Sequence, residues 1–343
     1  MPADVKVRVA VVGATGYAGA EVVRLLSAHP GAELVCVTSE KDAGRPLGEV
    51  HRYLAHTGLE LVAANVAQIL ARGADAAFVA LPHGASTAVV RELLLGGVRV
   101  IDIGADFRFA ERAVYERWYG PHAAPELLLE AVYGLTEHAR DRVMRARLVA
   151  NPGCYPTGAL MPLLPVADLI DGAVFVDSKS GTSGAGRTAA TNQLFAEVAE
   201  NIRPYSVWKH RHQPEIRARL AAAGTDVPVL FAAHLLPIAR GLLSACYFST
   251  AVGERVGLKL EQAYACEPFV RLLGPGQWPE PRNVRGTNLI EIGWHHDPES
   301  RTAVVMSAID NLGKGAAGQA VQNFNRMFGF AETTALQLTA ALP

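Results

Sequence analysis

The feature that most restricts the fold of this 343-residue chain lies near its N-terminus, where an apolar run meets a cluster of glycines. Residues 6–12 are mostly β-branched and apolar and predict a buried strand. Gly13, Gly16 and Gly19 follow, and residues 20–29 then carry apolar side chains on one side, as a helix does. A strand, a glycine turn and a helix in this order predict the first βαβ unit of a dinucleotide-binding domain.

Strands and helices continue to alternate over the first 150 residues, which predicts a Rossmann-type parallel sheet with helices on both faces. The further elements expected here are strands at 33–38, 75–81 and 99–103 and a helix ending at Leu94. The pattern changes at Asn151, where longer polar segments separate strands expected at 173–178, 228–233, 243–252, 287–294 and 302–308. We therefore expect an α/β chain with a parallel domain over 1–150 and a mixed or antiparallel α+β domain after it. Residues 313–327 predict a helix with one apolar face.

The composition excludes several classes of function. The net charge of −1 gives no basic surface for nucleic acid. No apolar run reaches the ~20 residues that a membrane span needs. The four cysteines form no CxxC pair, which argues against a zinc ribbon and a redox dithiol. Residues 1–8 contain no signal-peptide core, so we expect a cytoplasmic protein.

The glycine turn predicts a nucleotide site. Glycines let the main chain approach a pyrophosphate, and the following helix directs its free N–H groups at the phosphates. The spacing is GxxGxxG, and the alternative is a set of helix-capping glycines. The second strand ends in Thr38-Ser39-Glu40-Lys41. Ser39 and Lys41 favour the 2′-phosphate of NADP, although Glu40 argues for NAD and Lys41 is also explained as a surface charge.

One cysteine has the surroundings of a nucleophile. Cys154 follows a Pro152-Gly153 turn and precedes a helix expected over 157–164. Free N–H groups at a helix start stabilise a thiolate. The alternative is a small buried apolar residue, which is the interpretation we give to the other three cysteines.

Two histidines are candidate acid/base partners of that thiol. If 209–216 is extended, His210 and His212 share one face and Glu215 is placed to orient an imidazole. A metal pair or surface histidines are the alternatives, but a third metal ligand is missing, so no metal site is expected. His83 is expected to line the cleft at the sheet edge rather than to do chemistry.

Several basic residues are candidate ligands for an anionic substrate. The loop 178–187 offers hydroxyls, main-chain amides and two cations, but its composition also fits a flexible surface loop. Arg108 and Arg240 are further candidates, each with a structural ion pair as the alternative. The complete set of substrate-binding candidates is Arg108, Ser180, Lys179, Arg187, Glu215 and Arg240.

These residues resemble a known family. The matching motifs are GATGYAG at 13–19, LPHG at 81–84, ADFR at 105–108, NPGCYPT at 151–157, SGTSGAGR at 180–187, HRHQPEI at 210–216, ARG at 239–241 and IDNLGKGAAGQAVQN at 309–323. Together they resemble the N-acetyl-gamma-glutamyl-phosphate reductases, relatives of the aspartate-semialdehyde dehydrogenases. The likeness extends over essentially the whole chain.

The resemblance implies a Rossmann domain over 1–150 that the C-terminal helix 312–343 completes. It also implies a catalytic and oligomerisation domain over 151–311, similar to the C-terminal domain of glyceraldehyde-3-phosphate dehydrogenase. Cys154 matches the nucleophile, and His212, or else His210, matches the acid/base and substrate region. The cofactor candidates are Gly13, Thr15, Gly16, Tyr17, Gly19, Ser39, Lys41, Pro82, Gly184 and Asn323. A homodimer or homotetramer is expected.

The implied reaction is NADPH-dependent reduction of an acyl phosphate to an aldehyde through a Cys154 thioester. Glu40-Lys41 stands where the family often has an arginine pair, which weakens the NADP interpretation. Aspartate-semialdehyde dehydrogenase, a longer aminoadipyl substrate and a non-catalytic dinucleotide sensor are the alternatives. The HRHQPEI segment argues against the first, the NPGCYPT motif against the second, and the intact cysteine and histidines against the third.

Overall fold

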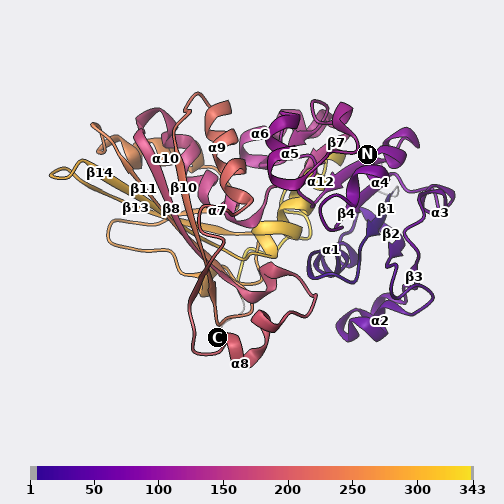
Figure 1. The fold of residues 1–343 in the computed structure, drawn as a ribbon. Helices are drawn as coiled ribbons and strands as arrows, with labels where there is room; N and C mark the ends of the chain where they lie inside the picture. The colour runs from indigo at the N-terminus through magenta and orange to yellow at the C-terminus, as the bar shows by residue number, and fades with distance from the viewer. Residues whose placement is uncertain (1–5, 341–343) are drawn as a thin grey trace. The chain divides into compact units, whose positions relative to one another are not determined.

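The computed structural model describes residues 6–340, and these form two compact units. The first unit contains the chain up to Pro152 together with Ala316–Leu336. The second contains Gly153–Gly315 and the residues from Gln337. Figure 1 shows the elements of both units, and each unit is described here by itself.

The first unit is built on a seven-stranded sheet whose pairs are all parallel, in the order β3-β2-β1-β4-β5-β7-β6. Its strands are β1 (Val7–Val12), β2 (Ala32–Thr38), β3 (Leu61–Val62), β4 (Ala76–Val79), β5 (Arg99–Asp102), β6 (Val132–Tyr133) and β7 (Leu148–Ala150). Its helices are α1 (Tyr17–Ser27), α2 (Leu47–Val50), α3 (Val66–Ala71), α4 (Ser86–Leu95), α5 (Arg112–Tyr119), α6 (Thr136–Arg145) and α12 (Gly318–Phe328). The predicted α/β class and parallel sheet are confirmed.

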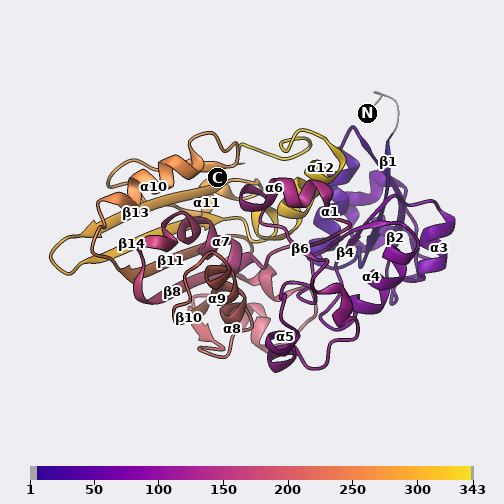
Figure 2. The same cartoon turned by 90° about the horizontal axis from the view of Figure 1, so that it is seen from above.

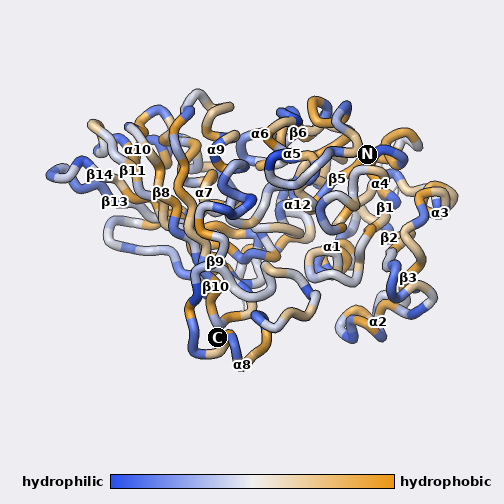
Figure 3. Tube along the Cα trace, in the orientation of Figure 1, coloured by the Kyte–Doolittle hydropathy of each residue, from blue (hydrophilic) through white to orange (hydrophobic). Residues whose placement is uncertain are grey.

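Helices cover both faces of this sheet. Ala77 and Val79 of β4 pack with α3 and α4 in one apolar cluster. Phe78 lies between them in sequence and therefore points to the opposite face, where its ring lies 5.7 Å from that of Phe324 on α12. Figure 3 colours β1 and β4 as hydrophobic over most of their length. A strand buried on both faces carries a continuous apolar run, as residues 9–12 do.

The second unit holds a seven-stranded mixed sheet in the order β12-β13-β14-β11-β8-β10-β9. Its strands are β8 (Asp171–Gly181), β9 (Arg203–Tyr205), β10 (Val229–Leu236), β11 (Leu242–Ser249), β12 (Val270–Leu272), β13 (Ile290–Asp297) and β14 (Thr302–Ile309). Its helices are α7 (Cys154–Leu163), α8 (Phe195–Val198), α9 (His212–Ala222), α10 (Arg255–Tyr264) and α11 (Pro281–Val284). Figure 2 shows α7 and α9 next to each other beside this sheet. The predicted mixed sheet is confirmed.

The two faces of the mixed sheet differ in composition. Ser178, Ser244 and Ser307 occupy opposed positions on β8, β11 and β14 and are buried towards α7. Strand alternation then sends Phe175 and Tyr247 to the other face, where they form an exposed cross-strand pair. Their side chains are 53% and 38% exposed, so this face carries large apolar groups in contact with solvent.

Candidate active site

The glycine turn of the first unit has the shape that a bound pyrophosphate needs. Gly13 has φ +86°, and a Cβ on Gly19 would lie 2.2 Å from the carbonyl oxygen of Gly13. Both glycines are therefore required by the turn itself. Gly16 differs, because a Cβ there would lie 3.7 Å from its nearest protein atom. The protein leaves room above Gly16 that a side chain would fill.

Helix α1 begins at this turn without a competing anion. Gly16 is its N-cap, no side chain caps its N–H groups, and no acidic residue lies in its first turn. Tyr17 is exposed and Thr15 is half-buried beside the turn. The imidazole Nε2 of His51 lies 3.0 Å from the Thr15 carbonyl oxygen. An uncapped helix start behind a glycine turn fits the phosphates of a dinucleotide.

The residues after β2 divide into a buried pair and exposed charges. The Ser39 hydroxyl lies 3.1 Å from that of Thr15 and donates to Asp42 at 3.3 Å. Lys41 is exposed, while Glu40 accepts the Ala64 N–H at 2.7 Å. The structure thus brings Ser39 to the glycine turn and turns the Glu40 carboxylate to the main chain.

The ADFR motif forms a buried polar cluster. The Asp106 carboxylate accepts the Gly84 N–H at 2.9 Å and hydroxyls from Ser86 and Tyr115 at 2.7 and 2.8 Å. Burial raises the pKa of the nearby Asp102 carboxyl to about 7, and the charge of Asp106 adds to the rise. Arg108 donates from Nε to the Asn151 carbonyl at 2.9 Å. Arg108 therefore braces the end of β7 from a buried position, and its predicted substrate contact stays a prediction.

Two other predicted cofactor residues occupy different environments. Pro82 is exposed directly after β4, at the carboxyl edge of the sheet. Asn323 is fully buried in α12, where it accepts the Thr136 hydroxyl at 2.7 Å and donates to the Gly134 carbonyl and Asn151 Oδ1 at 2.8 and 3.1 Å. The structure thus gives Asn323 a role in fastening α12 within the first unit.

In the second unit, the candidate nucleophile starts helix α7. Cys154 is the first helical residue, Gly153 is the N-cap, and no side chain caps the helix. The free main-chain N–H groups of a helix start stabilise an anionic thiolate. The thiol is half-buried, whereas Cys36 and Cys246 are buried and Cys266 is exposed. Burial raises the pKa of the Cys36 and Cys246 thiols, which makes both inert.

The helix that carries Cys154 is fastened to the sheet one turn further on. Pro162 lacks the N–H that would bond the Gly158 carbonyl within the helix. The Ser307 hydroxyl of β14 donates to that carbonyl instead, at 2.6 Å. A Cβ on Gly158 would lie 3.0 Å from the Ser244 hydroxyl, so α7 sits close on the serine row. The sheet thereby supplies the bond that the proline removes.

A glycine from the end of the unit packs on the thiol residue. A Cβ on Gly315 would lie 2.8 Å from the Cβ of Cys154. Any side chain at Gly315 would push the nucleophile from its position. Sequence reasoning missed this position, although GKG at 313–315 is a visible signal inside a motif.

The two histidines lie together, but the segment that carries them is not extended. Helix α9 begins at His212, so the extended conformation considered for 209–216 is not the one found. Pro214 and Glu215 in the first turn are typical of a helix start, so the sequence does contain an indication of this helix. The rings of His210 and His212 nevertheless lie 4.8 Å apart, because the turn into the helix brings them to one side.

His210 is held as a neutral ring in an aromatic box. Its ring lies 5.5 Å from that of Tyr155, 5.4 Å from Tyr205 and 5.1 Å from Phe231. Burial, helped by the charge of Arg211, lowers the pKa of His210 to about 4. Its Nδ1 accepts the His212 main-chain N–H at 3.1 Å. Near neutral pH, His210 is therefore uncharged and one of its ring nitrogens is occupied.

Tyr155 and Tyr205 close the box beside the thiol. Their hydroxyls lie 2.9 Å apart. Burial raises the pKa of Tyr205 to about 12, and the charge of Cys154 adds to the rise. The pKa of Tyr155 is also raised, first by burial and then by Tyr205. Both phenols therefore stay protonated, and Tyr205 is a residue for which the sequence held no signal.

Glu215 supports the turn before the nucleophile. It is fully buried and accepts the Gly153 N–H at 3.0 Å. That N–H is consequently directed at the buried Glu215 carboxylate. Glu215 lies among the predicted site residues as the side chain that fixes the N-cap of α7.

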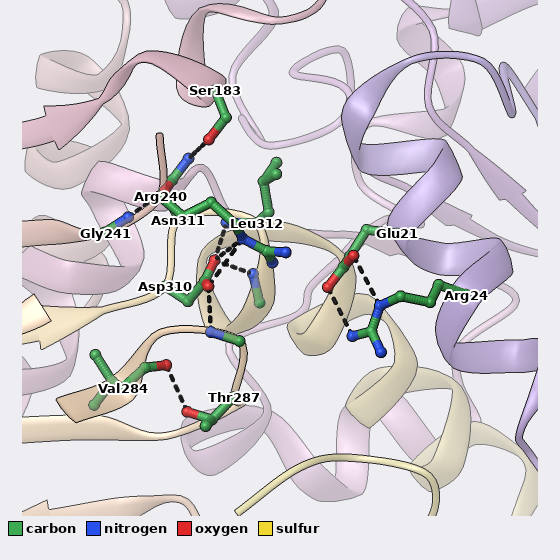
Figure 4. A network of polar contacts seen from close by, with 12 residues as sticks. Glu21, Arg24, Ser183, Arg240, Gly241, Val284, Thr287, Asp310, Asn311 and Leu312 are labelled. Carbon is green, nitrogen blue, oxygen red and sulfur yellow. Dashed lines mark hydrogen bonds and ion pairs between the residues drawn. The ribbon is translucent and has the colours of Figure 1, made fainter. Parts of the chain in front are cut away.

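The remaining basic candidates fall into two groups. Arg240 pairs with Asp310 through Nε at 3.0 Å, in the network of Figure 4. Ser180 is buried towards α7, whereas Lys179 alternates to the opposite face of β8 and pairs with Asp177. Adjacent strand residues point to opposite faces of a sheet, so Lys179 and Ser180 face different sides, and the substrate contact of Lys179 stays a prediction.

The loop after β8 carries the last two candidates. Gly184 lies in the short helical turn Thr182–Ala185, where a Cβ would lie 3.3 Å from the Ser180 hydroxyl. Arg187 is exposed just beyond that turn. The loop thus stays close to Ser180 at Gly184 and is solvent-exposed at Arg187.

Comparisons with known proteins agree with this geometry. A family model described as "Semialdehyde dehydrogenase, NAD binding domain" matches residues 8–146, and one described as "Semialdehyde dehydrogenase, dimerisation domain" matches 154–311. The N-acetyl-gamma-glutamyl-phosphate reductase of Akkermansia muciniphila is 48% identical over 96% of this chain and 99% of its own. That of Magnetococcus marinus is 47% identical over 98% and 99%. The chain belongs to the N-acetyl-gamma-glutamyl-phosphate reductase family. The resemblance inferred from the motifs is confirmed.

Solved structures share the fold at lower identity. Aspartate semialdehyde dehydrogenase II of Vibrio cholerae, complexed with ASA, superposes with a TM-score of 0.72 at 19% identity, covering 94% of this chain and 98% of that one. Aspartate semialdehyde dehydrogenase of Candida albicans, with NADP, gives 0.66 at 15% identity over 94% and 99%. At this identity the likeness establishes the fold.

Two features are absent from residues 6–340, the part of the chain that the structure describes. Between residues 6 and 340, no helix is long and apolar enough to cross a membrane. In the same range, no three or more His, Cys, Asp or Glu side chains are arranged to hold a metal ion.

Proposed function

We propose that this protein reduces N-acetyl-gamma-glutamyl phosphate to N-acetylglutamate semialdehyde and phosphate with NADPH, as a step of arginine biosynthesis. The observation that carries the proposal is Cys154 at the uncapped start of α7, directly before Tyr155, whose ring contacts both histidines. Relatives named for this reaction match nearly the whole chain at 47–48% identity. In this proposal the first unit binds the cofactor, and the second carries the chemistry.

The Cys154 thiolate attacks the acyl carbon of the substrate. A carbon–sulfur bond forms, the bond from that carbon to the phosphate oxygen breaks, and phosphate leaves with the bonding pair. The product on the enzyme is a thioester. Gly315 has no side chain that would displace Cys154. Glu215 fixes the turn before Cys154 by accepting the Gly153 N–H. The start of α7 supplies positive potential for the developing oxyanion.

His212 carries the proton in this mechanism. His210 is the weaker candidate because burial holds its pKa near 4 and its Nδ1 already accepts a main-chain N–H. His212 lies next to it at the start of α9, with its ring 5.7 Å from that of Tyr155. It protonates the carbonyl oxygen during reduction and takes that proton back when the sulfur leaves.

The cofactor site is formed by the glycine turn and the end of β2. The open space above Gly16 and the uncapped start of α1 receive the pyrophosphate. Ser39 and Lys41 are the proposed partners of the 2′-phosphate. The bound nicotinamide supplies the hydride. Pro82, Gly184 and Asn323 remain predicted neighbours of the cofactor.

The substrate's anionic groups need cations and hydroxyls. Arg240 and Ser180 are the proposed ligands within the second unit, because Arg240 is partly exposed and Ser180 faces α7. Arg187 and Arg108 remain predicted contacts. Arginine suits this role because its guanidinium can donate two parallel hydrogen bonds to two oxygens of one phosphate or carboxylate group.

We further propose that the protein is cytoplasmic and works as a homodimer or homotetramer. All four cysteines, including Cys154, are free thiols, as in a reducing compartment. The exposed Phe175–Tyr247 pair marks the sheet face that a second copy of this chain covers. Phe175→Asp is expected to shift the assembly to monomers in analytical ultracentrifugation.

The reaction is tested in the reverse direction. The protein is mixed with NADP, inorganic phosphate and N-acetylglutamate semialdehyde, and NADPH absorbance is followed. Cys154→Ser is expected to abolish turnover without changing NADP affinity, while Cys266→Ser, at an exposed cysteine, keeps full activity. Turnover by the Cys154 variant would refute the mechanism. Preference for aspartate semialdehyde would refute the substrate, and no NADPH at all would favour the dinucleotide sensor.

A further inference from the structure

Asp310 joins three segments of the second unit at one buried carboxylate. It follows β14 and is fully buried. Its Oδ1 accepts main-chain N–H groups from Leu312 and Gly313 at 2.8 and 2.9 Å. Its Oδ2 accepts the Gly286 N–H at 2.6 Å and lies 3.0 Å from Nε of Arg240. Figure 4 shows these donors converging on it.

Asn311 continues this arrangement on the next residue. Its Oδ1 accepts the Gly241 N–H at 2.8 Å, and its Nδ2 donates to the Ser183 hydroxyl at 2.9 Å. Arg240 and Gly241 are therefore held by two neighbouring side chains, one through the guanidinium and one through the main chain. Ser183, on the loop after β8, is tied to the same point (Figure 4).

The same short segment reaches the nucleophile. The Asp310 carbonyl accepts the Gly315 N–H at 2.9 Å. Gly315 in turn packs on Cys154, with no room for a Cβ between them. Residues 310–315 thus contact both the thiol residue and the arginine, and a displacement of Asp310 or Asn311 would change the distance between the two.

We propose that Asp310 and Asn311 are positioning residues that hold Arg240 and the Ser183 hydroxyl as a phosphate-binding site for the reaction of Cys154. This inference rests on the proposed function, which requires a phosphate group at the acyl carbon that Cys154 attacks. A guanidinium held through Nε presents its planar fork in a fixed orientation, which favours a tetrahedral oxyanion. A hydroxyl beside it adds a neutral donor.

The test compares two substitutions of one residue. Asn311→Ala removes both side-chain bonds. Asn311→Asp keeps an acceptor for the Gly241 N–H and accepts the Ser183 hydroxyl, which can donate. In the reverse reaction, we expect Asn311→Ala to raise the KM for inorganic phosphate about tenfold, as the loss of one or two hydrogen bonds would. Asn311→Asp keeps both contacts but places a carboxylate beside the proposed phosphate site, so charge repulsion should raise this KM at least as much.

Further measurements separate positioning from stability. The dissociation constant of NADP should stay unchanged in both variants. Asn283→Ala is the matched control, because its amide bonds Glu291 in the same unit and its KM for phosphate should not move. Asp310→Asn should lower kcat as well as phosphate affinity, since Asp310 also holds the turn that leads to Gly315.

A second readout does not depend on turnover. Inorganic phosphate should slow the alkylation of Cys154 by iodoacetamide in the parent protein and protect it far less in Asn311→Ala. An unchanged KM for phosphate and equal protection in Asn311→Ala would overturn the inference, whatever happens to its melting temperature. If the parent shows protection but no NADPH formation, the proposed function fails while the phosphate site stands.

Discussion

The bond from Ser307 to the Gly158 carbonyl makes a prediction that needs no substrate. Pro162 deprives that carbonyl of its helical donor, and the Ser307 hydroxyl replaces it at 2.6 Å between fully buried groups. Ser307→Ala should leave a buried acceptor without a partner, which costs about 1–3 kcal/mol in the free energy of unfolding. In a Pro162→Ala background the helix regains an N–H at position 162. The cost of Ser307→Ala in the free energy of unfolding should therefore be smaller there by at least about 1 kcal/mol.

The assay is a double-mutant cycle in urea. Three of the four tryptophans, Trp208, Trp278 and Trp294, belong to the second unit, so fluorescence follows its unfolding. The free energies of unfolding of the parent, both single variants and the double variant are compared, provided that all four have the same dependence on urea concentration.

A neighbouring serine provides the control for the cycle. Ser244 lies in the same buried row but bonds Ser178, at 2.8 Å, instead of the helix. Ser244→Ala should therefore cost the same with proline or alanine at position 162. If the effects of Ser307→Ala and Pro162→Ala add to within about 0.5 kcal/mol, the two residues are independent and the reasoning is refuted.

Three further predictions concern single sites. Gly315→Ala should reduce turnover at least about tenfold by displacing Cys154, measured as steady-state rates with circular dichroism to check the fold. Gly274→Ala should not, because a Cβ there has 3.5 Å of clearance. Equal activity of both variants would contradict the packing argument. Asp102 has a pKa of about 7 in the folded protein, above its value of about 4 in an unfolded chain, so its contribution to stability is complete below pH 4 and is lost as the pH rises through 7. That loss amounts to about 4 kcal/mol of the free energy of unfolding. Urea titrations from pH 4 to 8 should show this fall in stability in the parent and not in Asp102→Asn. The same dependence of stability on pH in both proteins would disprove the raised pKa. Gly19→Ala should abolish NADP binding measured by calorimetry, because its Cβ would collide with the glycine turn at 2.2 Å; tight binding would show that the turn adapts.

Local patterns in the sequence determined much of the fold. The apolar run at 6–12 and the glycines after it predicted β1 and α1 because a strand buried on both faces and a phosphate turn leave few other choices. The short strands β3 and β6 were not predicted, since two residues of extended chain carry no periodic signal. Their pairing depends on the neighbouring strands β2 and β7.

The site was predictable only in part. Cys154 stood out because its Pro-Gly turn and the following helix are adjacent in sequence. The helix start at His212 was not predicted. The alternation of His210 and His212 is compatible with a strand, although Pro214 and Glu215 are typical of a first helical turn. Tyr205 reaches the Tyr155 hydroxyl only through the pairing of β9 with β10, and no local pattern encodes such a contact.

The serine row beneath α7 also has a consequence for how this enzyme can diverge. Ser307 fastens the helix of the nucleophile to β14, one of the inner strands of the sheet. Arg240 and Ser183 instead sit on loops that are joined to one another at residues 310 and 311. The helix of the nucleophile is therefore anchored to the sheet, whereas the proposed recognition groups are anchored to loops. Mutations outside residues 310–315 can remodel those loops for a longer or differently charged acyl phosphate without disturbing the contact between Gly315 and Cys154, so the substrate range can change while the chemistry stays the same.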